Sequence, residues 1–362
     1  MVLNGVFIFK ENQMNRINKI VPADSNARFE AKKHWDSIAK PIGGLGLLET
    51  SIQKIAAVQR TPDVDISSRR VVVMCADNGV VSEGVTQSDS AVTAICANAI
   101  GDGTSSINKL AEAFGAEVMA VDIGINSDVH NPNILNKKIA YGTKNIAVGA
   151  AMTISQAEES IAVGMDIVRD LKTEGVKIII TGEMGIGNTT TAAAISSVLL
   201  GLPPKAVTGR GAGLDSAGLE RKIAVVEKAV EVNSPNADKP VELLSKIGGF
   251  DIGGMAGLFL GGAVYGIPVI IDGVISAAAA LLAYKIDPIS AEYMLASHVS
   301  NEPAGKLLLE MIGLKSVINA EMRLGEGTGG VMLLPLLDGA LSVYRSAHRF
   351  DDIGIERYVE LK

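Results

Sequence analysis

The sequence predicts a three-layer α/β fold, in which helices cover both faces of a parallel β-sheet. Short apolar runs alternate along the chain with longer segments of helical length, most of which begin near a Ser or Thr. The apolar runs contain few polar residues, which is typical of strands that are buried on both faces. Of the 362 residues, 48% are hydrophobic and 20% are charged, which suits a folded chain with a large core.

The expected elements follow in chain order. Strands are expected over residues 70–76, 117–122, 177–181 and 267–272. Helices are expected over residues 90–114, 155–173, 189–200, 216–232, 276–285 and 331–344. Residues 252–271 carry no charge, but Gly266 and Pro268 interrupt them, so we expect a buried Gly-rich helix and a short strand there instead of a membrane span.

The two ends of the chain have a different pattern from the middle. Residues 26–60 and 301–361 are mostly helical in pattern, and we expect them to meet in a small helical lobe. The predicted division is therefore a small helical lobe of residues 1–60 and 300–362 and an α/β domain of residues 61–299.

Composition limits the partners of the chain. The net charge is −7 and 4% of the residues are aromatic, so neither a nucleic acid nor a membrane is expected as a partner. The two cysteines and four histidines show no metal-ligand spacing and no disulfide framework, so we expect no metal and a reducing, cytoplasmic setting. The apolar run 6–9 is too short for an export signal.

A Gly-rich segment lies between the third expected strand and the helix that follows it. Residues 177–194 read as a buried strand, a loop with Gly182, Gly185 and Gly187, and an Ala-rich helix. These glycines are expected to adopt backbone angles that other residues avoid. The free amides and the dipole of the helix N-terminus favour a phosphate or a carboxylate, so the loop is expected to hold a nucleotide.

The spacing of these residues limits the kind of nucleotide. Gly182 and Gly187 stand as in a P-loop, but Asn188 occupies the position of the Lys that a P-loop requires, so hydrolysis of ATP or GTP is not expected. The order also differs from the Gly-x-Gly-x-x-Gly of dinucleotide sites, which argues against an oxidoreductase. On this pattern alone, a tight strand-to-helix turn capped by Thr189 stays open as the alternative.

Polar and glycine residues follow each of the four expected strands. They are Asp77, Asn78 and Gly79, then Gly124, then residues 182–185, and finally Asp272 and Gly273. Open α/β sheets bind ligands at the carboxyl ends of their strands, at the point where the strand order reverses. A ligand site is therefore expected at this edge of the sheet.

Three further side chains are open to two interpretations each. Glu326 lies between two glycines before an apolar helix, and is either a solvated loop acid or a general base whose pKa is raised by burial. Lys222 is either a point charge for a phosphate or an ordinary solvated lysine. His298 is expected to be a core histidine with its hydrogen bonds satisfied, not a ligand.

Several segments together resemble a known family, the nicotinate-nucleotide:dimethylbenzimidazole phosphoribosyltransferases of cobamide lower-ligand synthesis. The matching segments are residues 40–49, 75–81, 182–190, 245–251 and 323–329, in the family's order and within residues 25–345. The resemblance implies a Rossmann-like domain with a small helical lobe, and a dimer with active sites near the subunit boundary. It also implies transfer of phosphoribose from nicotinate mononucleotide to an aromatic base, with release of nicotinate and formation of an α-ribotide.

The resemblance also implies roles for individual residues. Glu326 is implied to take the proton from the incoming base. The implied contacts to the nucleotide phosphate and ribose are Glu183, Gly185, Gly187, Asn188, Lys222, Gly211 and Ser297. The implied contacts to the base are Ser88, Cys96, Asn78 and Leu324. No cofactor or metal is implied, because the cationic pyridinium of the substrate leaves as a neutral ring.

Two positions depart from the family's pattern. Members that use benzimidazole commonly have His where this chain has Asn78, and Gln where it has Cys96. A Gln can orient a ring nitrogen, whereas Cys is only a weak donor. We therefore hypothesise a different lower ligand, such as a phenolic compound, with which some anaerobe members work beside a paired second subunit. A non-catalytic nucleotide-binding subunit is the alternative, although such a subunit would be expected to lose Glu326.

Overall fold

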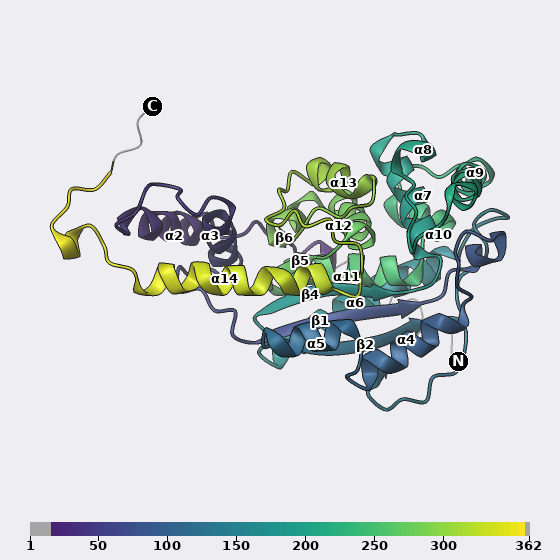
Figure 1. The fold of residues 1–362 in the computed structure, drawn as a ribbon, viewed down its shortest axis with the longest axis horizontal. Helices are drawn as coiled ribbons and strands as arrows, with labels where there is room; N and C mark the ends of the chain where they lie inside the picture. The colour runs from purple at the N-terminus through teal and green to yellow at the C-terminus, as the bar shows by residue number, and fades with distance from the viewer. Residues whose placement is uncertain (1–15, 359–362) are drawn as a thin grey trace.

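The computed structural model describes residues 16–358, so the apolar run 6–9 lies outside the described residues. Its centre is a six-stranded sheet in which every strand pair is parallel and the order is β3-β2-β1-β4-β5-β6. This is the strand order of Rossmann-like folds, and the chain order reverses between β1 and β4. Helices lie on both sides of the sheet, as Figure 1 shows, so the predicted three-layer α/β fold is confirmed.

The four predicted strands are present. They are β1 (Arg69–Ala76), β2 (Glu117–Gly124), β4 (Ile178–Met184) and β5 (Val269–Ile271). Two further strands, β3 (Ile134–Asn136) and β6 (Met294–Ala296), form the edges of the sheet and were not predicted. Each has only three residues, which is too short to show a period in the sequence.

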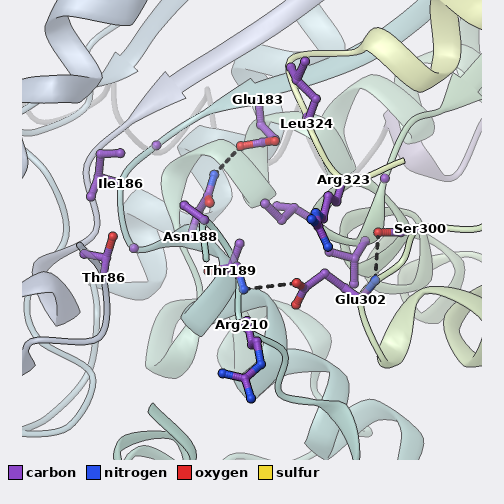
Figure 2. Close-up of a pocket in the computed structure, with 18 of the residues that line it drawn as sticks. Thr86, Glu183, Ile186, Asn188, Thr189, Arg210, Ser300, Glu302, Arg323 and Leu324 are labelled. Atoms are coloured by element: carbon purple, nitrogen blue, oxygen red, sulfur yellow. Dashed lines mark hydrogen bonds between the residues drawn. The ribbon is translucent and has the colours of Figure 1, made fainter. Parts of the chain in front are cut away.

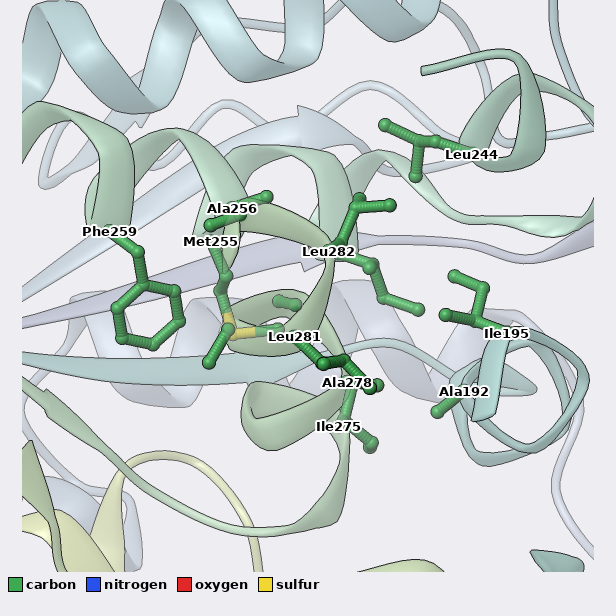
Figure 3. Close-up of a cluster of buried hydrophobic side chains, with 14 of the residues drawn as sticks. Ala192, Ile195, Leu244, Met255, Ala256, Phe259, Ile275, Ala278, Leu281 and Leu282 are labelled. Carbon is green, nitrogen blue, oxygen red and sulfur yellow. The ribbon is translucent and has the colours of Figure 1, made fainter. Parts of the chain in front are cut away.

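Alternate residues of the central strands enter two separate cores. In β1, Val72 and Met74 belong to one core, whereas Val71, Val73 and Cys75 belong to the other. The first core, drawn in part in Figure 3, packs the sheet against α6 (Ile154–Thr173), α7 (Asn188–Leu200), α10 (Pro240–Ile247), α11 (Phe250–Tyr265) and α12 (Val274–Ile286). The second packs it against α3 (Leu47–Gln59), α4 (Ala91–Gly101), α5 (Ser106–Ala113) and α14 (Thr328–Ser346).

The uncharged segment 252–271 is a buried Gly-rich helix, α11, followed by β5, as the sequence predicted. Its glycines allow close contact with α6: a Cβ on Gly257 would lie 2.0 Å from the carbonyl oxygen of Ile161, and one on Gly164 would lie 2.0 Å from that of Gly254. Within residues 16–358, no helix combines the length and apolarity that a membrane crossing requires.

The single helix predicted over residues 90–114 is wrong, because two helices occupy this range. Helix α4 ends at Gly101, and α5 begins at Ser106. Gly103 between them has a φ of +74°, and Ser105 forms a capping box with Asn108. A left-handed glycine and a new N-cap end one helix and start the next.

Helices from the N-terminal and C-terminal parts of the described chain lie side by side. Helices α2 (Ser25–Ser37) and α3 pack near α14, as Figure 1 shows, and the Trp35 and Tyr344 rings are 5.0 Å apart. Beyond α14, the Ala39 amide donates to the His348 carbonyl over 2.9 Å. Helix α13 (Ala304–Ile312) instead packs against α12 and α7. The division into a lobe of residues 1–60 and 300–362 stays a prediction.

The other described elements are α8 (Pro204–Val207), α9 (Ser216–Asn233) and the 3₁₀ turns η1 (Gly79–Glu83), η2 (Pro288–Tyr293) and η3 (Asp351–Ile353).

Candidate active site

A cavity of about 210 Å³ lies at the carboxyl ends of the strands, where the polar residues were expected to gather. Residues that follow β1, β4, β5 and β6 line it, together with the loop before α14. Figure 2 shows part of this lining. Eight predicted site residues are among those that line it: Glu183, Gly185, Gly187, Asn188, Gly211, Lys222, Leu324 and Glu326.

The Gly-rich loop after β4 differs in detail from the sequence prediction. Of its three glycines, only Gly187 has a positive φ, of +93°, and it is the N-cap of α7. Gly182 and Gly185 are needed for close approach instead: a Cβ on Gly185 would lie 2.2 Å from the Ala76 carbonyl oxygen. The predicted unusual backbone angles at Gly182 and Gly185 were therefore wrong, although all three positions need glycine.

The N-terminus of α7 opens towards the cavity without a side-chain cap. Thr189 is not the cap that the alternative interpretation of this loop supposed, because its hydroxyl accepts a 2.8 Å hydrogen bond from Lys222 Nζ. A helix N-terminus without a side-chain cap favours an anion.

Lys222 has no exposed surface, and burial lowers its pKa to about 8, while the charge of Glu302 raises it. Glu302 Oε1 also accepts a 3.0 Å hydrogen bond from the Gly211 amide, drawn in Figure 2. Gly211 has a φ of +53°, and a Cβ there would lie 3.1 Å from Lys222 Nζ. Glu302 thus holds the Gly211 loop against the lysine.

Glu183 and Asn188 point towards each other on the floor of the cavity, as Figure 2 shows. The Asn188 Nδ2 donates to Glu183 Oε2 and also to Asp251 Oδ2, the latter over 3.0 Å. Burial raises the pKa of Glu183 well above its usual value and raises that of Asp251 to about 6. One amide group therefore bridges two buried carboxyl groups that resist ionisation.

Glu326 lines the same cavity and has a strained backbone conformation. Its φ is +61°, which is rare for a residue with a side chain. The Ile107 amide, in the first turn of α5, donates to Glu326 Oε2 over 3.3 Å. Burial raises the pKa of Glu326, whereas this hydrogen bond lowers it and the charge of Asp272 raises it.

The backbone of Glu326 packs directly on β4. A Cβ on Gly182 would lie 2.5 Å from the Glu326 carbonyl oxygen, and a Cβ on Gly325 would lie 2.5 Å from Glu183 Oε1. Gly182 therefore makes room for the backbone of the Glu326 loop. The sequence had instead predicted that it belongs to the anion-binding loop before α7. The two Gly-rich motifs, far apart in the sequence, form one site.

Sequence reasoning missed several residues that line the cavity. Asp272 and His298 lie together beside Glu326, and Arg210, Glu302 and Arg323 face the same space. Asp272 was noted only as one of several strand-end residues. His298 is buried and bonded to Ser297, as expected of a core histidine, but it also lines the cavity. Arg323 stands three residues before Glu326, so its place in the same Gly-rich motif was the available signal.

Four predicted site residues do not line the cavity. Asn78 has no exposed surface, and its Oδ1 accepts from the Thr191 hydroxyl. Ser297 is equally buried, and its hydroxyl donates to the Ile271 carbonyl over 2.6 Å. Cys96 is half-buried, and its pKa is raised by burial and by the charge of Glu326. Ser88 follows residues 85–87, which do line the cavity.

Among residues 16–358, no group of three or more His, Cys, Asp and Glu side chains is arranged to hold a metal ion. The charged groups of the cavity gather in two places. Lys222, Arg210 and Glu302 line it around the Gly211 loop, and Glu183, Asp272, Glu326 and Arg323 line it near the loop before α14. The Asp272 charge raises the pKa of both Glu183 and Glu326. The lysine beside the uncapped start of α7 favours an anionic group, and the clustered carboxyl groups favour a cationic or protic one.

Comparison with known proteins gives one consistent result. A family model described as "Phosphoribosyltransferase" matches residues 20–355. The nicotinate-nucleotide–dimethylbenzimidazole phosphoribosyltransferase of Clostridium acetobutylicum is 41% identical over 351 residues, which cover 97% of this chain and 100% of the relative. The enzyme of the same name from Acetivibrio thermocellus is 43% identical over 90% of this chain and 93% of its own length.

Solved structures agree with this result. The crystal structure of CobT from Thermus thermophilus superposes with a TM-score of 0.86 and 36% sequence identity, and the match covers 92% of this chain and 100% of that one. From its site, its sequence and its fold, this chain therefore belongs to the nicotinate-nucleotide–dimethylbenzimidazole phosphoribosyltransferase family.

Proposed function

We propose that this protein transfers phosphoribose from nicotinate mononucleotide to an aromatic lower-ligand base, releasing nicotinate and forming an α-ribotide for cobamide synthesis. The observation that carries the proposal is the position of Glu326, which lines the same cavity as an uncapped helix N-terminus and a buried lysine. This arrangement brings a proton acceptor and a candidate phosphate site together in one cavity.

Glu326 is the proposed general base. One of its oxygens is held by the Ile107 amide, and the other has no hydrogen-bond partner among the described residues. As the nucleophilic atom of the base attacks C1 of the ribose, its proton passes to Glu326, and the bond from C1 to the pyridinium nitrogen breaks. The electron pair of that bond neutralises the ring, so nicotinate leaves without further activation. Burial raises the pKa of Glu326 and makes it a better proton acceptor.

The phosphate is proposed to bind at the α7 end of the cavity. Gly185, Gly187 and Asn188 supply backbone at the start of the helix, and Lys222 and Gly211 lie beside it. The helix dipole and the lysine charge both favour an anion there. Glu183, whose pKa is raised by burial, is proposed to form a hydrogen bond near the ribose.

The base is proposed to lie between Leu324 and the side of the cavity near Ser88 and Cys96. Leu324 lines the cavity and is 54% exposed, so it offers an apolar surface to a ring. Cys96 is close enough to Glu326 for the carboxylate charge to raise the pKa of the thiol, yet a thiol is a weak donor and does not hold a second ring nitrogen. A phenol attacks through oxygen and needs no such partner, so we propose that the protein accepts phenolic bases.

The proposal is tested by incubating the purified protein with nicotinate mononucleotide and a panel of benzimidazoles, purines and phenols, and measuring released nicotinate by chromatography. Release with at least one base, and an α-ribotide as the second product, is expected. Turnover of dimethylbenzimidazole without turnover of any phenol would refute the phenolic proposal alone. No release with any base, alone or with a paralogous subunit, would refute the transferase proposal and favour a non-catalytic subunit.

Glu326→Gln provides the test of the base. The amide accepts no proton, so turnover is expected to fall by roughly 10²- to 10⁴-fold while the melting temperature stays close to that of the wild type. Glu321→Gln is the matched control, because Glu321 is an exposed acid that also has a positive φ and does not line the cavity. Equal activities of the two variants would contradict the role of Glu326.

We also propose that the working unit is a dimer, either of two copies or with a paralogue, in which the second subunit completes the active site. Size-exclusion chromatography with light scattering, on this chain alone and mixed with the paralogue, distinguishes the two. A chain that stays monomeric in both samples and is fully active would contradict this part of the proposal.

A further inference from the structure

Asp272 makes backbone contacts on the C-terminal side of Glu326. It follows β5 directly, and the residue is 3% exposed. Asp272 Oδ2 accepts a hydrogen bond from the Gly327 amide and Oδ1 accepts one from the Gly330 amide, each over 3.1 Å. These amides belong to the residues one and four positions after Glu326, at the start of α14. One carboxylate thus fixes the backbone that carries the proposed base.

The Glu326 backbone requires such a constraint. A residue with a side chain at a φ of +61° is in an unfavourable conformation, which persists only where the surroundings impose it. On the other side, the loop packs against Gly182 of β4, because a glycine without a side chain leaves room for the Glu326 carbonyl group. The loop is therefore held between β4 on one side and Asp272 on the other.

Asp272 is itself held by neighbouring residues. Its amide donates to Ser276 Oγ over 3.2 Å, and the Ser297 hydroxyl donates to the preceding Ile271 carbonyl. Because that hydroxyl proton is committed to a carbonyl, His298 Nδ1, 3.1 Å from Ser297 Oγ, is the donor in their contact. The His298 ring lies against Gly329, where a Cβ would be 2.0 Å from Nδ1 and 2.9 Å from Asp272 Oδ1.

We propose that Asp272, supported by His298 and Ser297, is the positioning residue that holds Glu326 in its reactive geometry. The proposal rests on the proposed function. Asp272 acts through the Gly327 and Gly330 amides and does not itself exchange a proton with the substrate. Ser297, which the family resemblance placed in contact with the substrate, belongs on this proposal to the support of Asp272.

This arrangement also has an electrostatic consequence for Glu326. The groups that face Glu326 are Cys96 on α4, the Ile107 amide on α5, Glu183 at the end of β4, and Asp272 with His298 behind it. Burial raises the pKa of Asp272, while the His298 ring and the three glycine amides lower it. The Asp272 charge in turn raises the pKa of Glu326. Removal of that charge is expected to lower the pKa of Glu326.

The test is Asp272→Asn in the full-length protein. An Asn side chain has one acceptor oxygen, and its NH₂ group would face a backbone N–H, so one of the two amide bonds is lost. We expect kcat to fall about 100-fold with KM for nicotinate mononucleotide little changed, because displacement of a reacting group costs rate more than binding. In the pH profile of kcat/KM, the rise on the acid side is expected to move to lower pH, because the pKa of Glu326 falls. A purely structural defect would not cause this shift.

Asp122→Asn is the matched control. Asp122 is also a buried acid of the sheet, near the end of β2; it is 2% exposed, accepts a hydrogen bond from the Ile125 amide over 2.9 Å and does not line the cavity. It is expected to lower stability without moving the pH profile. Wild-type kcat in Asp272→Asn, an unmoved acid limb, or the same kinetic losses in both variants would each overturn the proposal.

Hydrogen exchange separates this proposal from the proposed function, because it needs no activity. Backbone amides of residues 325–331 are expected to exchange faster in Asp272→Asn than in the wild type or in Asp122→Asn. If Asp272→Asn does not fold, His298→Asn, which keeps the carboxylate but removes the ring against Gly329, is expected to show the same faster exchange. Unchanged exchange of residues 325–331 in these variants would overturn the positioning role of Asp272. If the wild-type protein is inactive but the exchange of residues 325–331 becomes faster in the variant, only the transferase proposal is overturned.

Discussion

Lys222 is a lysine without exposed surface, and its charge determines how strongly the cavity attracts a phosphate. Burial lowers its pKa to about 8, so the ammonium form predominates below that pH and the neutral amine above it. We therefore expect kcat/KM for nicotinate mononucleotide to fall above about pH 8. On the acid side, kcat/KM is expected to rise with pH through the raised pKa of Glu326, because only the carboxylate accepts a proton. A pH profile of initial rates measures both limbs.

The variant Lys222→Met tests whether Lys222 causes the fall in kcat/KM above about pH 8. A phosphate monoester completes its ionisation near pH 6, so the substrate itself does not titrate above about pH 8. Loss of a charged hydrogen bond, about 1.5–3 kcal/mol, is expected to raise KM roughly 10- to 100-fold and to remove the fall above about pH 8. A variant that keeps this fall would show that another group causes it.

At the scale of elements, the site depends on contact between β4 and the loop before α14. A Cβ on Gly182 would lie 2.5 Å from the Glu326 carbonyl oxygen and 2.8 Å from its carbon, so either the strand or the loop must move. Gly182→Ala is expected to lower the free energy of unfolding by about 1–3 kcal/mol, as overpacking does. It is also expected to lower kcat about 100-fold, because Glu326 is displaced. Urea unfolding and steady-state rates measure the two effects.

Gly339→Ala is the control for that variant. Gly339 lies in α14, the helix that follows the Glu326 loop, and a Cβ there would meet no atom within 4 Å. Because Ala favours a helix over Gly, this variant is expected to gain up to about 1 kcal/mol of stability with unchanged kcat. Equal behaviour of the two variants would mean that contact at Gly182 does not position Glu326.

The same contacts explain how far the sequence predicts the fold. The long strands and most helices follow from apolar periodicity and caps, which are local properties. The edge strands β3 and β6 have three residues each and depend on their neighbours for pairing. The division of residues 90–114 was visible in the sequence, because residues 101–106 contain no apolar side chain and include Gly103 and Ser105.

The parts of the site that lie within one short sequence motif were predictable. The loop from Gly185 to Asn188 and the Gly-flanked Glu326 both line the cavity. The relation between them was not predictable, because Gly182 meets Glu326 only after β4 and α14 have folded side by side. Asp272 was missed for the same reason, since its partners Gly327 and Gly330 are 55 and 58 residues away in the chain.

At the scale of the whole molecule, α14 connects the site to the ends of the chain. Its first turn carries an amide that Asp272 holds, and its last turn contains Tyr344, which packs on Trp35. Figure 1 shows the helix extending from the sheet to α2 and α3. Trp35 belongs to the same buried cluster as Val71 of the sheet, with Leu337 of α14 also in it.

Because this core is continuous, we expect the predicted helical lobe, which includes α2 and α3, to unfold together with the sheet. Trp35 is the only tryptophan of the chain and is fully buried, so its fluorescence reports on the lobe alone, whereas far-UV circular dichroism reports on the whole fold. In urea the two transitions are expected to have the same midpoint. Ile52→Ala, in the lobe, is expected to lower stability by about 2–5 kcal/mol and to shift both midpoints equally. If only the fluorescence transition moved, the lobe would be an independent folding unit, and α14 would not transmit its stability to the Glu326 loop.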